Sequence, residues 1–147
     1  MSPTTATHSR RRTKPRPALG ARRAGYVVAV LLNALMLYAV NVWPGWDAVP
    51  FLTGDTVDVL DLVNASIVVN LAANVVFLFR DTPRVKALGD LVTTAVGLLP
   101  MVALWRVFPF DLSAGWDTVA RILLGVGMAG SVVGILSAIN KLTHPDE

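Results

Sequence analysis

Four long apolar stretches constrain the fold of this chain more than any other feature. They cover about residues 26–43, 57–79, 85–108 and 116–139, and short polar connections join them. Each stretch is long enough for a helix that crosses about 30 Å of hydrocarbon, which takes roughly 17 to 25 residues. Strands of a membrane barrel would be about half as long and would alternate in polarity. We therefore predict an all-α, polytopic membrane protein with a bundle of four transmembrane helices.

The apolar stretches lack the polar stripe that a soluble helical bundle needs. Helices of a soluble bundle place polar residues at every third or fourth position on their solvent face. The segments 27–32 and 96–104 contain no charged or amide side chain at all. Composition agrees, because 54% of the 147 residues are hydrophobic and only 16% are charged. A lipid bilayer is therefore the expected environment of the helices.

Lys and Arg are distributed unevenly, which predicts the orientation of the chain in the membrane. The connections 44–56 and 109–115 contain neither residue type, and only Arg106 and Arg121 lie near them. The other positive residues lie in the N-terminal segment, in the middle connection and near the C-terminus: Arg10, Arg11, Arg12, Lys14, Arg16, Arg22, Arg23, Arg80, Arg84, Lys86 and Lys141. Because positive residues stay on the cytoplasmic side, we expect both termini there. Interfacial tryptophans mark the opposite helix ends: Trp43, Trp46, Trp105 and Trp116.

Residues 1–25 are rich in Ser, Thr, Pro and Arg, which predicts a disordered, basic cytoplasmic tail. Its positive charges would attract anionic lipids, at about 1 kcal/mol for each charge near the surface. Residues 26–140 form the expected transmembrane domain, and residues 141–147 form a short second cytoplasmic tail. The net charge of +3 thus reflects membrane topology, and binding to nucleic acid is not expected.

Five asparagines lie inside the first two predicted helices, where amides need partners. At about 1.5 Å of rise per residue, Asn41 and Asn64 fall at the same depth. Asn33 falls between the depths of Asn70 and Asn74. We predict a ladder of interhelical amides, each worth about 0.6 to 2 kcal/mol. The alternative is that the same side chains line a polar path through the membrane.

A group of charged residues is predicted at the outer ends of helices two, three and four. Asp58 and Asp61 begin the second helix, Arg106 ends the third, and Asp117 and Arg121 begin the fourth. Because an unpaired arginine is costly in lipid, we predict that Arg121 pairs with Asp61 or Asp58, with Arg106 and Asp117 nearby. The cluster is either a salt bridge that sets helix order or a cation site that opens outward.

Glycines in the fourth stretch predict close helix packing. Gly125, Gly127 and Gly130 formally match a dinucleotide-binding motif, but no strand precedes them and they lie in mid-membrane. Together with Gly134 they instead form ridges of small residues, which allow another helix to approach closely. The sequence leaves open whether Gly127, Gly130 and Gly134 pack within one chain or between chains.

Catalytic chemistry has little support in the sequence. There is no cysteine, and both histidines, His8 and His144, lie in the tails. No histidine base or metal site is therefore available within the bundle. Lys86 lies one turn before Asp90, and these two residues are expected to pair with each other. We predict no enzymatic activity, no metal and no cofactor.

Three segments resemble a known group of proteins. Residues 41–46 (Asn-Val-Trp-Pro-Gly-Trp), 50–53 (Pro-Phe-Leu-Thr) and 106–111 (Arg-Val-Phe-Pro-Phe-Asp) look like small four-helix membrane proteins of high-GC Gram-positive bacteria. The resemblance implies a multi-pass protein of the bacterial plasma membrane, but that group has no assigned activity. Small multidrug carriers are similar in size, yet they depend on a glutamate in their first helix, where this chain has Asn33 and Asn41.

Two hypotheses about function remain open at this point. The first is a small structural or accessory membrane protein that associates with itself or with a larger membrane complex through the fourth helix. The second is a minimal oligomeric channel or carrier whose path involves Asp61, Arg121 and the asparagines. The lipid bilayer is the expected partner in both.

Overall fold

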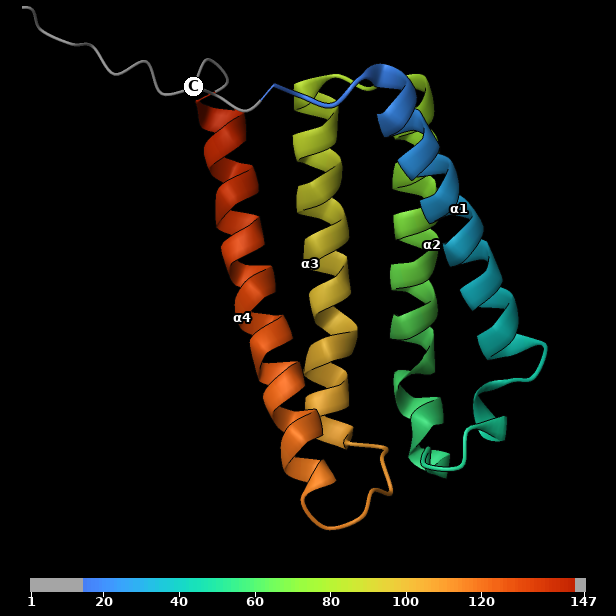
Figure 1. Ribbon diagram of the computed structural model, residues 1–147. Helices are drawn as coiled ribbons and strands as arrows, with labels where there is room; N and C mark the ends of the chain where they lie inside the picture. The colour runs from blue at the N-terminus through green and yellow to red at the C-terminus, as the bar shows by residue number, and fades with distance from the viewer. Residues whose placement is uncertain (1–14, 145–147) are drawn as a thin grey trace, which may run out of the picture.

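The computed structural model describes residues 15–144, and these residues fold into four long helices (Figure 1). They are α1 (Leu19–Asn41), α2 (Val57–Phe79), α3 (Pro83–Val107) and α4 (Trp116–Thr143). Each helix is long and apolar enough to cross a membrane, so the predicted four-helix transmembrane architecture is confirmed. Two short 3-10 helices, Trp46–Ala48 and Gly54–Thr56, lie in the connection between α1 and α2.

The helix bounds differ from the prediction mainly at the two chain ends. α1 begins at Leu19, so residues 19–25 of the predicted disordered tail are helical, because Ala and Arg in this segment are good helix formers. α4 continues to Thr143, since no residue before Pro145 interrupts it. Residues 15–18 of the predicted tail are described and lie outside any helix, whereas residues 1–14 and 145–147 lie outside the described residues.

The beginning of α3 is defined by two residues. Thr82 precedes the helix, and its hydroxyl accepts a hydrogen bond of 3.3 Å from the amide of Val85. Pro83 occupies the first helical position, where its missing N–H would have had no partner. α3 therefore begins directly after a three-residue connection from α2, which holds the two helices side by side.

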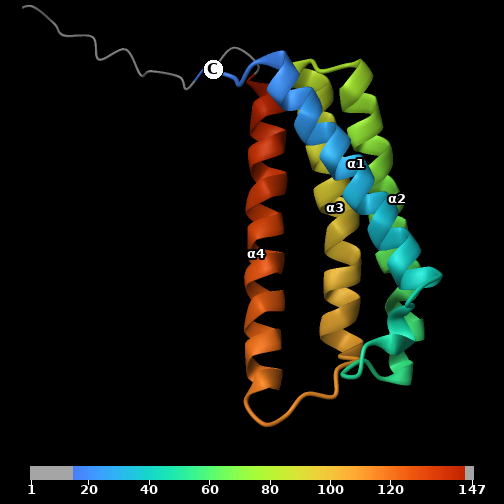
Figure 2. The same ribbon diagram turned by 45° about the vertical axis from the view of Figure 1, so that its right-hand side comes forward.

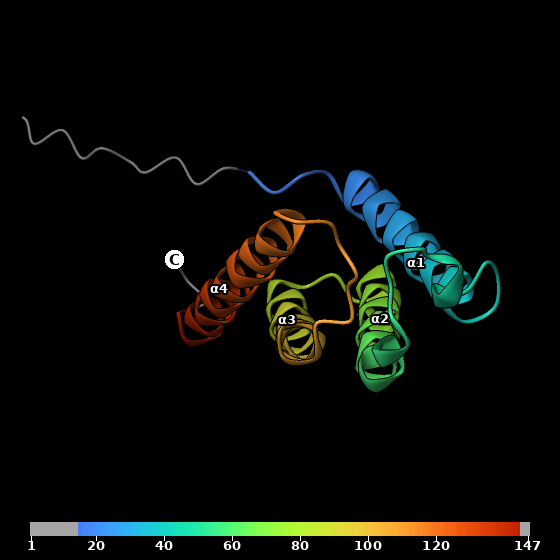
Figure 3. The same cartoon turned by 90° about the horizontal axis from the view of Figure 1, so that it is seen from below.

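The helices pack in chain order as a curved row. Over the described part of the chain, substantial contacts join α1 to α2, α2 to α3 and α3 to α4, and α1 and α4 lie at the two ends of the row (Figure 3). α1 also runs obliquely to the other helices (Figure 2). Because the row does not close on itself, few apolar side chains of residues 15–144 are buried: Val59, Ile67, Phe77, Ala87, Pro100, Pro109 and Ala138.

The two ends of the described chain, residues 15 and 144, lie at the same end of the row, as expected for an even number of spans. We call this the terminal end; it carries the start of α1, the connection 80–82 and the end of α4. We call the opposite end, which carries the connections 42–56 and 108–115, the hairpin end.

Small residues allow the helices to approach closely. A Cβ atom placed on Gly89 of α3 would collide with the ring of Phe77 on α2. On α4, a Cβ at Gly127 would lie 3.4 Å from the Met101 sulfur. A Cβ at Gly134 would lie 3.5 Å from the Thr94 methyl group. Packing of α3 against α2 thus depends on Gly89, whereas a Cβ at Gly127 or Gly134 would make an ordinary contact with α3.

Two loops at the hairpin end connect the two halves of the chain. Leu52 and Phe110 form an isolated antiparallel bridge. The amide of Thr53 donates to the carbonyl of Pro109 at 2.9 Å, and Pro109 is itself fully buried. These backbone contacts hold the α1–α2 hairpin to the α3–α4 hairpin at this end of the row.

Candidate functional site

The charged residues predicted to cluster at the hairpin end do not form ion pairs in the structure. Asp58, Asp61, Arg106, Asp117 and Arg121 are all exposed, and no salt bridge links any of them to another described residue. The reason is the order of the helices. Since α3 lies between α2 and α4, an arginine on α4 cannot reach a carboxylate on α2 directly.

Arg121 packs against aromatic rings instead of a carboxylate. Its guanidinium carbon lies 4.2 Å from the ring centre of Phe108 and 5.3 Å from that of Trp105. One of its nitrogens also lies 3.5 Å from the carbonyl oxygen of Trp105. Stacking on aromatic faces is worth about 0.5 to 1 kcal/mol at an exposed site. Arg121 therefore has favourable contacts without an acidic partner.

The asparagines form one interhelical pair rather than a ladder. Asn41 and Asn64 exchange two reciprocal hydrogen bonds of 2.8 Å, which join the hairpin ends of α1 and α2. The amides of Asn33, Asn70 and Asn74 donate to carbonyl oxygens four residues earlier in their own helices. Among these five asparagines, only Asn41 and Asn64 form a hydrogen bond between helices.

The glycines of α4 divide between two faces. Gly127 and Gly134 face α3, as described above, and therefore serve packing within the chain. A Cβ at Gly130, by contrast, would meet no heavy atom within 4 Å, and the residue is exposed. Gly127 and Gly134 therefore pack within one chain. Gly130 lies on a face that no part of residues 15–144 covers.

A cluster of charged and hydrogen-bonding side chains around Asp81, at the terminal end, was not predicted from the sequence. The carboxylate of Asp81, in the connection between α2 and α3, is only 4% exposed. One oxygen accepts hydrogen bonds from Arg16 at 3.2 Å and from the hydroxyl of Tyr26 at 3.1 Å. The other lies 3.0 Å from Arg22 in a charge contact that lacks hydrogen-bond alignment. Asp81 therefore fastens the first turns of α1 to the α2–α3 connection.

Aromatic and charged contacts continue this cluster toward α3. The rings of Tyr26 and Phe77 lie 5.4 Å apart, and the ammonium group of Lys86 lies 4.9 Å from the centre of the Phe77 ring. Lys86 also forms the predicted salt bridge with Asp90, one turn further along α3. A signal for this network was present in the sequence, because Asp81 is the one acidic residue between Arg80 and Arg84.

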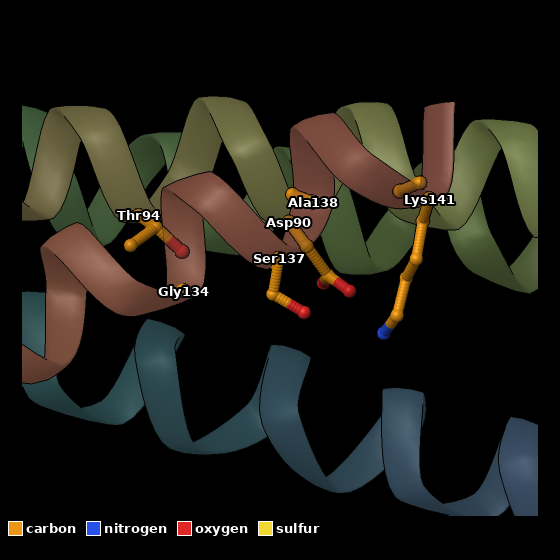
Figure 4. Close-up of a pocket in the computed structure, with 7 residues that line it drawn as sticks. Asp90, Thr94, Gly134, Ser137, Ala138 and Lys141 are labelled. Atoms are coloured by element: carbon orange, nitrogen blue, oxygen red, sulfur yellow. The ribbon is translucent and has the colours of Figure 1, made fainter. Parts of the chain in front are cut away.

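A polar pocket lies between α3 and α4 at the terminal end (Figure 4). It has a volume of about 260 Å³. Small side chains leave room for it, and charged or hydroxyl groups supply its polar lining. The lining residues are Ala87, Asp90 and Thr94 from α3 and Gly134, Ser137, Ala138 and Lys141 from α4.

Among residues 15–144, no group of three His, Asp or Glu side chains is arranged to hold a metal ion. Comparison of the chain with protein-family models, with curated proteins and with solved structures found no match. The arrangement of the helices and the positions of their polar groups are therefore the observations that bear on function.

Proposed function

We propose that this protein is a small structural or accessory membrane protein that associates with itself or with a larger membrane complex through the exposed face of α4. The observation that carries the proposal is the position of Gly130. This glycine lies in the middle of a transmembrane helix, on a face with no neighbour among the described residues. Small residues at such positions allow the backbone of another helix to approach closely.

The surroundings of Gly130 have the shape expected of a helix contact. Val126 and Val133 lie about one turn to either side of it on the same face, and each is 65% exposed. The glycine thus forms a notch between two β-branched side chains, into which a ridge of a second helix would fit. β-branched residues also lose little side-chain entropy when they pack, because they have one preferred rotamer in a helix.

The open row of helices is consistent with an accessory role. Among the other three long helices, only α2 packs substantially against α1. None of the residues of α1 is fully buried. Large parts of α1 and α4 therefore remain available to lipid or to another protein. A helix of a larger assembly could pack on either end of the row without displacing any contact described above.

We further propose that the terminal end faces the cytoplasm of a bacterial plasma membrane. Seven positive residues of the described chain lie at this end: Arg16, Arg22, Arg23, Arg80, Arg84, Lys86 and Lys141. The positive-inside rule supports this orientation. The resemblance to small membrane proteins of high-GC Gram-positive bacteria supports the choice of membrane.

The geometry does not favour the alternative of a minimal channel or carrier. That hypothesis requires a charged path that includes Asp61 and Arg121, and the structure places these residues on helices that do not pack together. Asn33 donates its amide hydrogen to its own helix, which leaves a polar route along α1 without support.

The test of the accessory role is a Gly130→Leu variant, with the particle mass measured by native mass spectrometry after release from lipid nanodiscs. Leucine at this position meets no atom of the same chain, so the fold should be retained while association with the second helix is lost. Gly25→Leu is the matched control, because Gly25 on α1 is also exposed and without neighbours. The proposal fails if Gly130→Leu leaves the assembly unchanged or if both variants weaken it equally.

A further inference from the structure

The pocket between α3 and α4 places the exposed side chains of Ser137 and Lys141 beside the small residues Gly134 and Ala138. Figure 4 shows the side chains of Asp90, Ser137 and Lys141 extending to the same side of the helix pair. Ala87, Gly134 and Ala138 lack bulk, which is why a hollow of about 260 Å³ persists between two helices that otherwise pack closely. Its lining is mixed, because Asp90, Thr94, Ser137 and Lys141 add polar groups to the apolar walls.

The pocket extends from the level of lipid headgroups into the hydrocarbon. The 28 residues of α4 span about 42 Å, which matches the roughly 40 to 45 Å thickness of a bilayer with its headgroups. Lys141 lies two residues before the end of α4, and Gly134 lies about 14 Å from that end. Lys141 is thus at headgroup level, whereas Gly134 is at the level of the acyl chains.

The charges of the pocket leave a single positive charge to be neutralised. Asp90 is paired with Lys86, so these two groups cancel each other. Lys141 forms no salt bridge with any residue in the range 15–144. The hydroxyls of Ser137 and Thr94 can donate hydrogen bonds to an anionic oxygen. Because Lys141 lies at headgroup level, the favoured ligand is a lipid whose headgroup brings one negative charge.

We propose that this pocket binds an anionic phospholipid that carries one negative charge. Its phosphodiester group lies against Lys141 and Ser137, and an acyl chain follows the α3–α4 groove past Gly134. A zwitterionic lipid fits less well, because its own cation would meet the unneutralised lysine. This inference goes beyond the accessory role, since it assigns a ligand at the terminal end of α4, about two turns from Gly130.

The first test is lipid retention in nanodiscs that contain equal amounts of phosphatidylglycerol and phosphatidylcholine, measured by native mass spectrometry. We expect the wild-type protein to retain phosphatidylglycerol in preference to phosphatidylcholine. Lys141→Gln should lower that preference by about fivefold, the effect of one charge worth about 1 kcal/mol. Arg84→Gln is the control, because Arg84 is an exposed cation at the same end of the protein outside the pocket.

Three outcomes would overturn the inference. One is equal retention of the two lipids by the wild-type protein, and another is an equal loss for Lys141→Gln and Arg84→Gln. The third is equal stabilisation by a lipid and by inorganic phosphate, measured by thermal unfolding in zwitterionic detergent. Added phosphatidylglycerol should raise the unfolding temperature of the wild-type protein, and millimolar inorganic phosphate should not. An equal shift with inorganic phosphate would assign the pocket to a free anion. Ser137→Leu, which fills the pocket without removing charge, should abolish the shift.

Discussion

Replacing Asp81 with alanine is expected to destabilise the protein by about 3 kcal/mol, because it leaves a largely buried arginine without its counter-charge. The side chain of Arg22 is 19% exposed, which places its pairing at the lower end of the roughly 3 to 5 kcal/mol range for broken buried pairs. Arg16 is 45% exposed, so its contribution is at most about 1 kcal/mol. Loss of the hydrogen bond from Tyr26 adds to the effect.

The assay is equilibrium unfolding in mixed micelles with increasing dodecyl sulfate, followed by circular dichroism. Asp55→Ala serves as the control, because Asp55 is an exposed aspartate in the connection between α1 and α2 and should tolerate the change within about 0.5 kcal/mol. Hydrogen exchange should also show that the first turns of α1 open more readily in Asp81→Ala. Equal stability of the two variants would refute the view that Asp81 anchors α1.

Three further perturbations test the packing and polar contacts, each by the same unfolding assay. Gly89→Ala should cost about 1 to 3 kcal/mol, since its methyl group collides with the Phe77 ring; a neutral change would mean that α2 and α3 are further apart than described. Asn64→Leu should cost about 0.6 to 2 kcal/mol, and Asn41→Leu in the same chain should add little, because the two amides bond to each other. Arg121→Leu should change stability by no more than about 1 kcal/mol; a larger loss would point to an ionic partner.

The helical spans could be predicted because length and hydrophobicity alone specify them. The start of α1 could not, since Arg22 and Arg23 end the apolar run while the helix continues through them. Arg22 is tolerated there because Asp81 neutralises it, and Asp81 is distant in the sequence. Contacts of this kind depend on the tertiary arrangement, which hydropathy does not encode.

Depth along a helix predicted some side-chain pairs and not others. Asn41 and Asn64 lie at equal depth on helices that pack against each other, so equal depth brings them together. Arg121 and Asp61 also lie at similar depth, but a row of helices in chain order separates α2 from α4. Depth specifies position along the membrane normal, whereas pairing also requires neighbouring helices. The pocket beside Lys141 likewise depends on which helices are neighbours, and depth does not specify this.

The most direct test of the central claim is site-specific photo-crosslinking in native membranes. A photoreactive phenylalanine analogue at Val133, on the exposed face of α4 beside Gly130, should yield a discrete product joined to a second protein chain. The same analogue at Val28, an exposed position on α1, should react with lipid alone. Lipid adducts without a protein product at Val133 would contradict the proposal that this face of α4 binds a partner.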